Sequence, residues 1–83
     1  MSLEDERRSG TLRIGTKQTV KAVEIGAAKK VFVARDADLK LINKIGALAK
    51  KTGVEIVYID SMKQLGKACG IEVGAAMAAV VNE

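Results

Sequence analysis

The stretch VFVARDADLKLINKIGALAKKTGVEIVYI, residues 31–59, contains the pattern from which the fold class follows. Its first four residues form a continuous apolar run, which predicts a strand buried on both faces. Between Leu39 and Thr52, apolar side chains recur at helical spacing and the lysines fall mainly on the opposite side, so this segment predicts an amphipathic helix. Gly53 provides the left-handed residue that ends such a helix. Residues 55–59 predict the next strand.

The segment before this stretch predicts further short elements of both kinds. Residues 11–14 alternate polar and apolar side chains, which indicates a short strand. A helix is expected over residues 15–25, with Gly26 at its end. A short first helix is expected over residues 4–9, ended by Gly10.

The segment after it begins with a helix start signal. Residues 61–64, SMKQ, match a capping box, in which the Ser61 hydroxyl accepts a hydrogen bond from the amide three residues later. We expect a short helix from there to Gly70 and a loop over residues 71–74. The last apolar run, residues 75–81, is ambiguous, because its alanines favour a helix and its two valines favour a strand. Since helices and strands alternate elsewhere, the chain predicts an α/β sandwich in which this run is a buried strand.

The composition excludes most catalytic chemistry. The 83 residues are enough for one small domain, over residues 1–83, and they include no histidine and a single cysteine. A structural zinc site, a haem ligand and a serine–histidine or cysteine–histidine pair are therefore not available within this chain. With one Phe and one Tyr, the chain also lacks the aromatic platform that stacks single-stranded RNA. We expect neither an enzyme nor a cofactor.

The sequence predicts a cytoplasmic protein with an acidic partner. Cys69 has no second cysteine with which to form an internal disulfide, as expected in a reducing compartment. The charged opening MSLEDERR lacks the apolar region of a signal peptide, and no apolar run approaches the roughly 20 residues that span a bilayer. The net charge of +4 points weakly to an acidic polymer such as nucleic acid.

Residues 15–21, GTKQTVK, form the most informative polar segment. Lys17, Gln18 and Lys21 are spaced three and four apart, so they lie on one face of the expected helix. The unpaired amides at a helix start attract a phosphate or a base acceptor, while Lys and Gln side chains can bind base edges. This segment therefore predicts a nucleic-acid contact, and an ordinary solvated helix start is the alternative on the residues alone.

Three other features have simpler interpretations. Residues 10–17 contain two glycines and a lysine, but their spacing departs from that of a phosphate loop, so nucleotide hydrolysis is not expected. Asp36 and Asp38 have no third candidate metal ligand, and capping of the long helix by either of them is the simpler role. Cys69, at a helix end, is expected to be a small buried residue.

Two separated motifs resemble the kink-turn-binding ribosomal protein family of the L7Ae and L30e type. They are IGTKQTVK at residues 14–21 and LGKACGIEVGAA at residues 65–76, and the similarity extends in order from Leu12 to Val81. It is greatest to the short bacterial YbxF-type members. The resemblance implies a three-layer α/β/α sandwich with a mixed sheet of about four strands, and it implies RNA as the ligand.

The resemblance also implies which residues contact the RNA. A kink turn is an RNA duplex bent sharply at a short bulge, beside tandem sheared G·A pairs. In this family, the helix start after the glycine-containing turn meets the G·A pairs, and the loop after the short C-terminal helix covers the bulge. An acidic and an apolar side chain lie near the flipped-out nucleotide. In this sequence the implied RNA-binding residues are Gly15, Thr16, Lys17, Gln18, Lys21, Asp38, Ile42, Ile71, Glu72 and Val73.

The function expected from the sequence is therefore non-enzymatic RNA binding. The protein would recognise and stabilise kink turns in ribosomal or riboswitch-type RNA, with the ribosome as a candidate partner. We expect a monomer that binds no metal and no membrane. The alternative is a protein-interaction module of the same fold without specific RNA binding, which would associate through its alanine-rich final segment.

Overall fold

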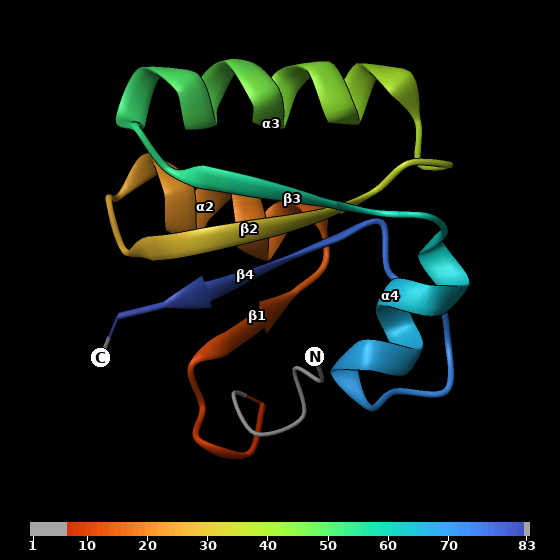
Figure 1. The fold of residues 1–83 in the computed structure, drawn as a ribbon. Helices are drawn as coiled ribbons and strands as arrows, with labels where there is room; N and C mark the ends of the chain where they lie inside the picture. The colour runs from red at the N-terminus through yellow and green to blue at the C-terminus, as the bar shows by residue number, and fades with distance from the viewer. Residues whose placement is uncertain (1–6, 83) are drawn as a thin grey trace.

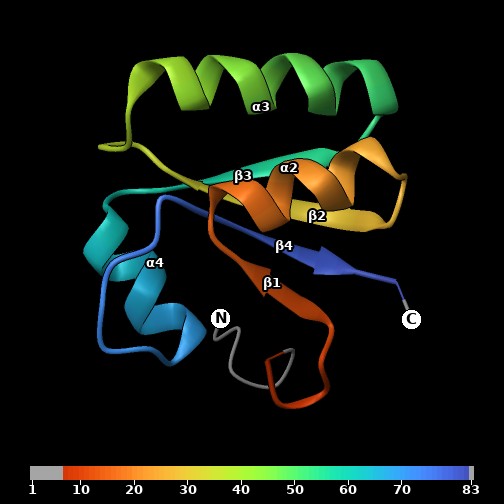
Figure 2. The same ribbon diagram turned by 180° about the vertical axis from the view of Figure 1, so that it is seen from behind.

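The computed structural model describes residues 7–82 of the chain and contains a four-stranded sheet with helices on both faces (Figures 1 and 2). The strands are β1 Leu12–Ile14, β2 Ala28–Ala34, β3 Glu55–Ile59 and β4 Met77–Val81. The helices are α2 Thr16–Glu24, α3 Leu39–Thr52 and α4 Met62–Cys69. Of the first helix expected over residues 4–9, residues 7 and 8 are helical, and residues 4–6 lie outside the described part of the chain.

The sheet is mixed, with the strand order β1-β4-β2-β3. The last strand, β4, lies between β1 and β2 and is antiparallel to both, whereas β2 and β3 are parallel. Strands β1, β2 and β3 therefore run in the same direction and end at the same edge of the sheet, where β4 begins. The expectation that residues 75–81 contain a buried strand is confirmed, with the strand itself starting at Met77.

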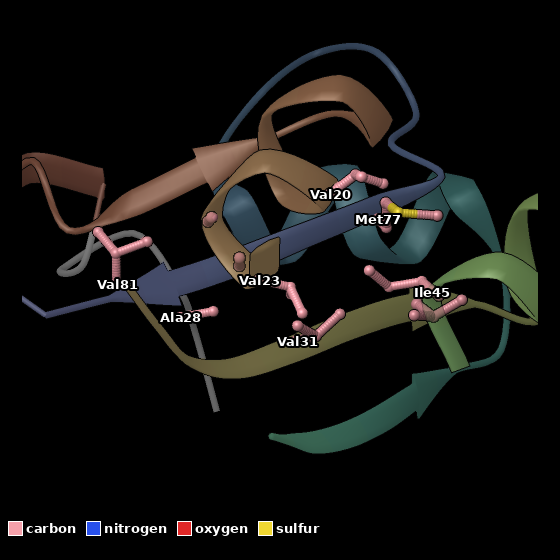
Figure 3. Close-up of a cluster of buried hydrophobic side chains, with 10 residues drawn as sticks. Val20, Val23, Ala28, Val31, Ile45, Met77 and Val81 are labelled. Carbon is pink, nitrogen blue, oxygen red and sulfur yellow. The ribbon is translucent and has the colours of Figure 1, made fainter. Parts of the chain in front are cut away.

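The alternation of side chains along the two central strands creates two cores. Val31 and Val33 of β2 join a cluster with residues of α2, α3 and β4, part of which is drawn in Figure 3. Phe32 and Ala34 point to the opposite face and join a cluster that includes Leu65 and other residues of α4. Helices α2 and α3 thus cover one face and α4 covers the other, which confirms the three-layer α/β/α sandwich.

The strand β2 is longer than the apolar run that predicted it. It begins at Ala28, and Lys29 and Lys30 form its first polar part, before the buried residues 31–34. The two lysines interrupt the apolar run, so a hydrophobicity pattern does not indicate this end of the strand. The pairing of β2 with β4 is also irregular between Ala28 and Lys30, a local interruption typical of a β-bulge. Among the residues described, no helix has the length and apolar character needed to cross a membrane.

Candidate functional site

Three chain segments meet at one edge of the sheet and build the candidate site. The Gly15 amide donates to the Met77 carbonyl over 2.9 Å, which joins the end of β1 to the start of β4. The Ala34 amide donates to the Ala76 carbonyl over 2.9 Å, which joins the end of β2 to the same point. The start of α2, the β2–α3 connection and the loop before β4 are therefore held at this edge by backbone hydrogen bonds.

The start of α2 offers backbone donors. Gly15 precedes the helix with φ 107° and ψ 158°, a conformation that favours glycine, and it has no side chain with which to cap the helix. The Thr19 amide donates to the Gly15 carbonyl over 3.0 Å, so the three amides of residues 16–18 precede this first helical bond. An uncapped helix start combines these donors with the positive end of the helix dipole, so it favours an anionic or hydrogen-bond-accepting group.

The side chains on this helix add positive charge to the same place. Lys17, Gln18 and Lys21 are exposed, while Thr16 is half-buried. Helix α2 is fixed beneath them, since Val20 and Val23 are buried in the first core. Basic residues near a helix N-terminus are unfavourable by themselves, which a bound anion would offset.

Arg13 is a member of this surface that the motif analysis did not identify. It lines an open hollow together with Gln18 and Lys21, and its guanidinium donates to the Gly10 carbonyl over 2.7 Å. The signal for it was present in β1, where Arg13 is the exposed residue between buried Leu12 and half-buried Ile14. A charged side chain on the open face of a three-residue edge strand carries too little pattern to be singled out from sequence.

The loop after α4 forms the second part of the site. Ile71 is half-buried and packs against the second core, while Glu72 and Val73 are exposed, Val73 to 70%. The loop is held against α4 at both ends: the Ile71 amide donates to the Gly66 carbonyl, and the Ala75 amide donates to the Met62 carbonyl, each over 3.0 Å. Val73 is therefore an apolar side chain that the fold leaves uncovered on a tethered loop.

A close approach of the backbone fixes the position of this loop. A Cβ atom on Gly66 would overlap the Val73 carbonyl oxygen, so only glycine allows the loop to lie directly on α4. The helix then ends at Gly70, which has the left-handed φ of 80°. The position of Val73 therefore depends on Gly66 within α4 and on Gly70 at its end.

The two carboxylates of the β2–α3 connection have different partners. Asp38 caps α3, accepting a 2.8 Å hydrogen bond from the Lys40 amide. Asp36 does not cap α3; it accepts a 2.7 Å hydrogen bond from the Met62 amide at the start of α4. The interpretation that one of these carboxylates caps the long helix is thus confirmed by Asp38, while residue 36 faces the neighbouring connection across the sheet edge.

The two remaining site residues expected from the sequence, Ile42 and Asp38, differ in how far their side chains are available to a ligand. Ile42 is half-buried on α3 and packs against the first core, so only part of its side chain is available to a ligand. Asp38 is exposed but already engaged with the helix amide. The structure thus brings the start of α2, the start of α3 and the loop before β4 to one edge. The exposed polar side chains of α2 there are Lys17, Gln18 and Lys21.

The described residues near the site include neither a cluster of metal-binding groups nor an exposed thiol. Within residues 7–82, no group of three or more carboxylate or thiol side chains is placed to hold a metal ion. Cys69 is buried in the second core, and burial raises the pKa of its thiol, with the nearby Arg7 acting in the opposite direction. Burial and a raised pKa both disfavour the reactive thiolate form.

Comparison with known proteins gives a consistent set of matches. The model of the "Ribosomal protein L7Ae/L30e/S12e/Gadd45 family" matches residues 2–83. An "RNA-binding protein" of Geobacillus thermodenitrificans is 51% identical over 82 residues, which are 99% of this chain and 100% of that protein. The "RNA-binding protein YbxF" of Geobacillus stearothermophilus is 49% identical over 82 residues, again 99% of this chain and 100% of that protein.

A ribosomal protein and a solved structure are also similar to this chain. "Large ribosomal subunit protein eL8" of Halobacterium salinarum is 43% identical over 81 residues, covering 96% of this chain and 68% of that protein. The structure of the "Giardia lamblia 15.5kD RNA binding protein" superposes with a TM-score of 0.90 at 26% identity, covering 98% of this chain and 68% of the other.

Proposed function

Because the chain belongs to the L7Ae/L30e/S12e/Gadd45 family of ribosomal proteins, we propose that it is a non-enzymatic RNA-binding protein that recognises and stabilises kink turns. The observation that carries the proposal is the uncapped start of α2, where backbone donors, Lys17, Gln18 and Lys21 are exposed together. Relatives that share about half of its residues are named as RNA-binding proteins, which supports RNA as the ligand.

The start of α2 is suited to a widened RNA groove at non-canonical pairs. A Cβ atom built on Gly15 has no other atom within 4 Å, so it would project into open space. The absence of a side chain at this position keeps that space free where the helix would approach the RNA. Gln18 has both a donor and an acceptor and can contact the exposed edges of sheared G·A pairs. Lys17, Lys21 and the neighbouring Arg13 would offset the repulsion between phosphates at the bend.

The loop before β4 would cover the nucleotides of the bulge. Ile71 and Val73 supply the apolar contacts, and Glu72 lies between them. Asp38 and Ile42, at the start of α3, would lie near a nucleotide that leaves the stack. Unstacked bases are the part of an RNA that proteins read most readily, so this second contact adds specificity to the electrostatic one.

The proposed mechanism is a shift of population. Free RNA of this kind exchanges between an extended and a bent form, and a protein whose contacts exist only with the bent form raises its share by the difference in affinity. Recognition is then mainly of RNA shape and of the G·A pairs. Ribosomal RNA is one natural target of this type and a riboswitch-type RNA is another.

The test is calorimetric titration of the protein with a minimal kink-turn RNA. The matched control is the same RNA with its G·A pairs replaced by Watson–Crick pairs. We expect tight binding to the first and weak binding to the second. Equal, weak binding to both would contradict the proposal and favour the alternative, a protein-interaction module of the same fold.

A further inference from the structure

The groove between α2 and α3 is a positively charged surface that continues from the start of α2 away from the sheet edge. Lys17 and Lys21 of α2 and Lys44 of α3 line it, and Val20 and Ile25 are among its apolar lining residues. Ile25 is 68% exposed, which leaves the far end of the groove open. Two of these three lysines belong to the proposed RNA contact, and the third comes from a separate helix.

The charges of this groove are not neutralised within the protein. None of the three lysines forms an ion pair with another described residue, whereas Lys30 pairs with Glu55 elsewhere, at 3.9 Å. Glu24 is the one carboxylate that lines the groove, against the three ammonium groups. Helix α3 itself carries four lysines and no acidic residue over Leu39–Thr52. The groove therefore favours a polyanion.

We propose that this groove holds the phosphate backbone of the RNA stem that extends beyond the bend, with Lys44 as the contact contributed by α3. The inference rests on the proposed function, because the same RNA must already be seated at the start of α2. Lys17, Lys21 and Lys44 line the same groove, so a stem seated along it against the first two would also meet Lys44. The contact would be to phosphate, so it would add affinity without reading sequence.

Helix α3 offers a matched control in Lys50. This lysine has the same charge and is exposed on the same helix, but it does not line the groove. Six residues along an α-helix correspond to a rotation of about 120° away from Lys44 and a shift of about 9 Å along the axis. Both side chains are on the surface, so their truncation is not expected to disturb the core.

The experiment compares Lys44→Ala and Lys50→Ala with the unmodified protein in binding to three kink-turn RNAs. One RNA has stems of at least a full helical turn on both sides of the bulge, and the others are shortened on one stem or the other. With long stems, Lys44→Ala should weaken binding roughly fivefold and reduce the slope of log affinity against log salt by about 0.9. Lys50→Ala should leave both quantities unchanged, and Lys44→Arg should restore both.

Stem length identifies the contact. Shortening one particular stem should remove the difference between Lys44→Ala and the unmodified protein, while the G·A preference is kept. Equal effects of Lys44→Ala and Lys50→Ala, or a Lys44→Ala loss that persists when either stem is shortened, would overturn the groove proposal alone. Failure of the unmodified protein to prefer the kink-turn RNA would overturn the proposed function and the groove proposal together.

Discussion

Gly15 has a backbone conformation that the site requires and that only glycine adopts without strain. Its φ of 107° is a conformation that L-residues rarely adopt, yet a Cβ atom there would meet no other atom within 4 Å. Gly15→Ala should therefore be costly through backbone strain alone, by about 1–2 kcal/mol of unfolding free energy. Urea unfolding followed by circular dichroism measures this change.

Gly46 provides the control for this substitution. It lies inside α3, has no positive φ, and likewise has no atom within 4 Å of a built Cβ. Gly46→Ala should stabilise the protein by up to about 1 kcal/mol, because alanine is the better helix former. The same methyl group thus has opposite effects at two open positions. A destabilisation of equal size at both would show that space, and not backbone conformation, is limiting.

Gln18 and Lys21 should have separable roles in RNA binding. Lys21→Ala removes a charge, so it should weaken binding to the kink-turn RNA and to its Watson–Crick control alike. It should also reduce the slope of log affinity against log salt by about 0.9, the value of one phosphate contact. Gln18→Ala should reduce the preference for the G·A pairs, by about 1–3 kcal/mol for a bidentate contact. Calorimetry with both RNAs measures the two quantities. Equal losses on both RNAs for Gln18→Ala would contradict its assignment as the discriminating side chain.

At the scale of elements, the loop before β4 depends on its packing against α4. Gly66→Ala would push a methyl group into the Val73 carbonyl oxygen, so the loop has to move away from the helix. We expect a loss of about 1–3 kcal/mol of unfolding stability, as in other overpacked sites. RNA affinity should also fall, because Ile71 and Val73 would no longer be presented together. Heteronuclear NMR spectra should show shifts concentrated in residues 71–76, and unchanged loop signals would refute this account.

The start of α4 shows how far an element can be predicted from local sequence. The capping box predicted that the Ser61 hydroxyl accepts from the Gln64 amide, and the structure confirms this bond at 3.1 Å. The second carboxylate cap, from Asp36 to the Met62 amide, joins residues 26 positions apart. No local pattern contains that bond, because it exists only once β2 and β3 lie side by side. Local caps are therefore predictable, whereas caps between connections require the topology.

At the scale of the whole molecule, the sequence predicted the layers but not the order of the strands. Buried runs such as residues 31–34 and the helix over Leu39–Thr52 carry their periodicity in the chain itself. The insertion of β4 between β1 and β2 is set by long-range pairing, such as Ile14 with Ala78. The pattern of the short strand β1 was too weak to single out Arg13, and its place in one hollow with Gln18 also depends on how β1 meets α2.

The stability of the whole molecule should depend on pH through one buried thiol. Burial raises the pKa of Cys69, so at alkaline pH the unfolded chain releases the thiol proton before the folded protein does. The thiol's contribution to unfolding free energy is fully present below the ordinary thiol pKa of about 8.5 and falls as pH rises toward the raised value. Chemical unfolding under reducing conditions, between about pH 7 and 10, measures this loss.

Cys69→Ala separates the thiol from every other titrating group, since all the others are common to both proteins. The variant should be less stable near neutral pH, because Cys69 is fully buried against Leu65 and its neighbours and a cavity would remain. The advantage of the unmodified protein should then shrink as pH rises, because the variant lacks the buried thiol whose ionisation favours the unfolded chain. Two stability curves that stay parallel up to pH 10 would show that the thiol does not couple ionisation to folding, and rapid labelling of Cys69 in the folded protein would contradict its burial.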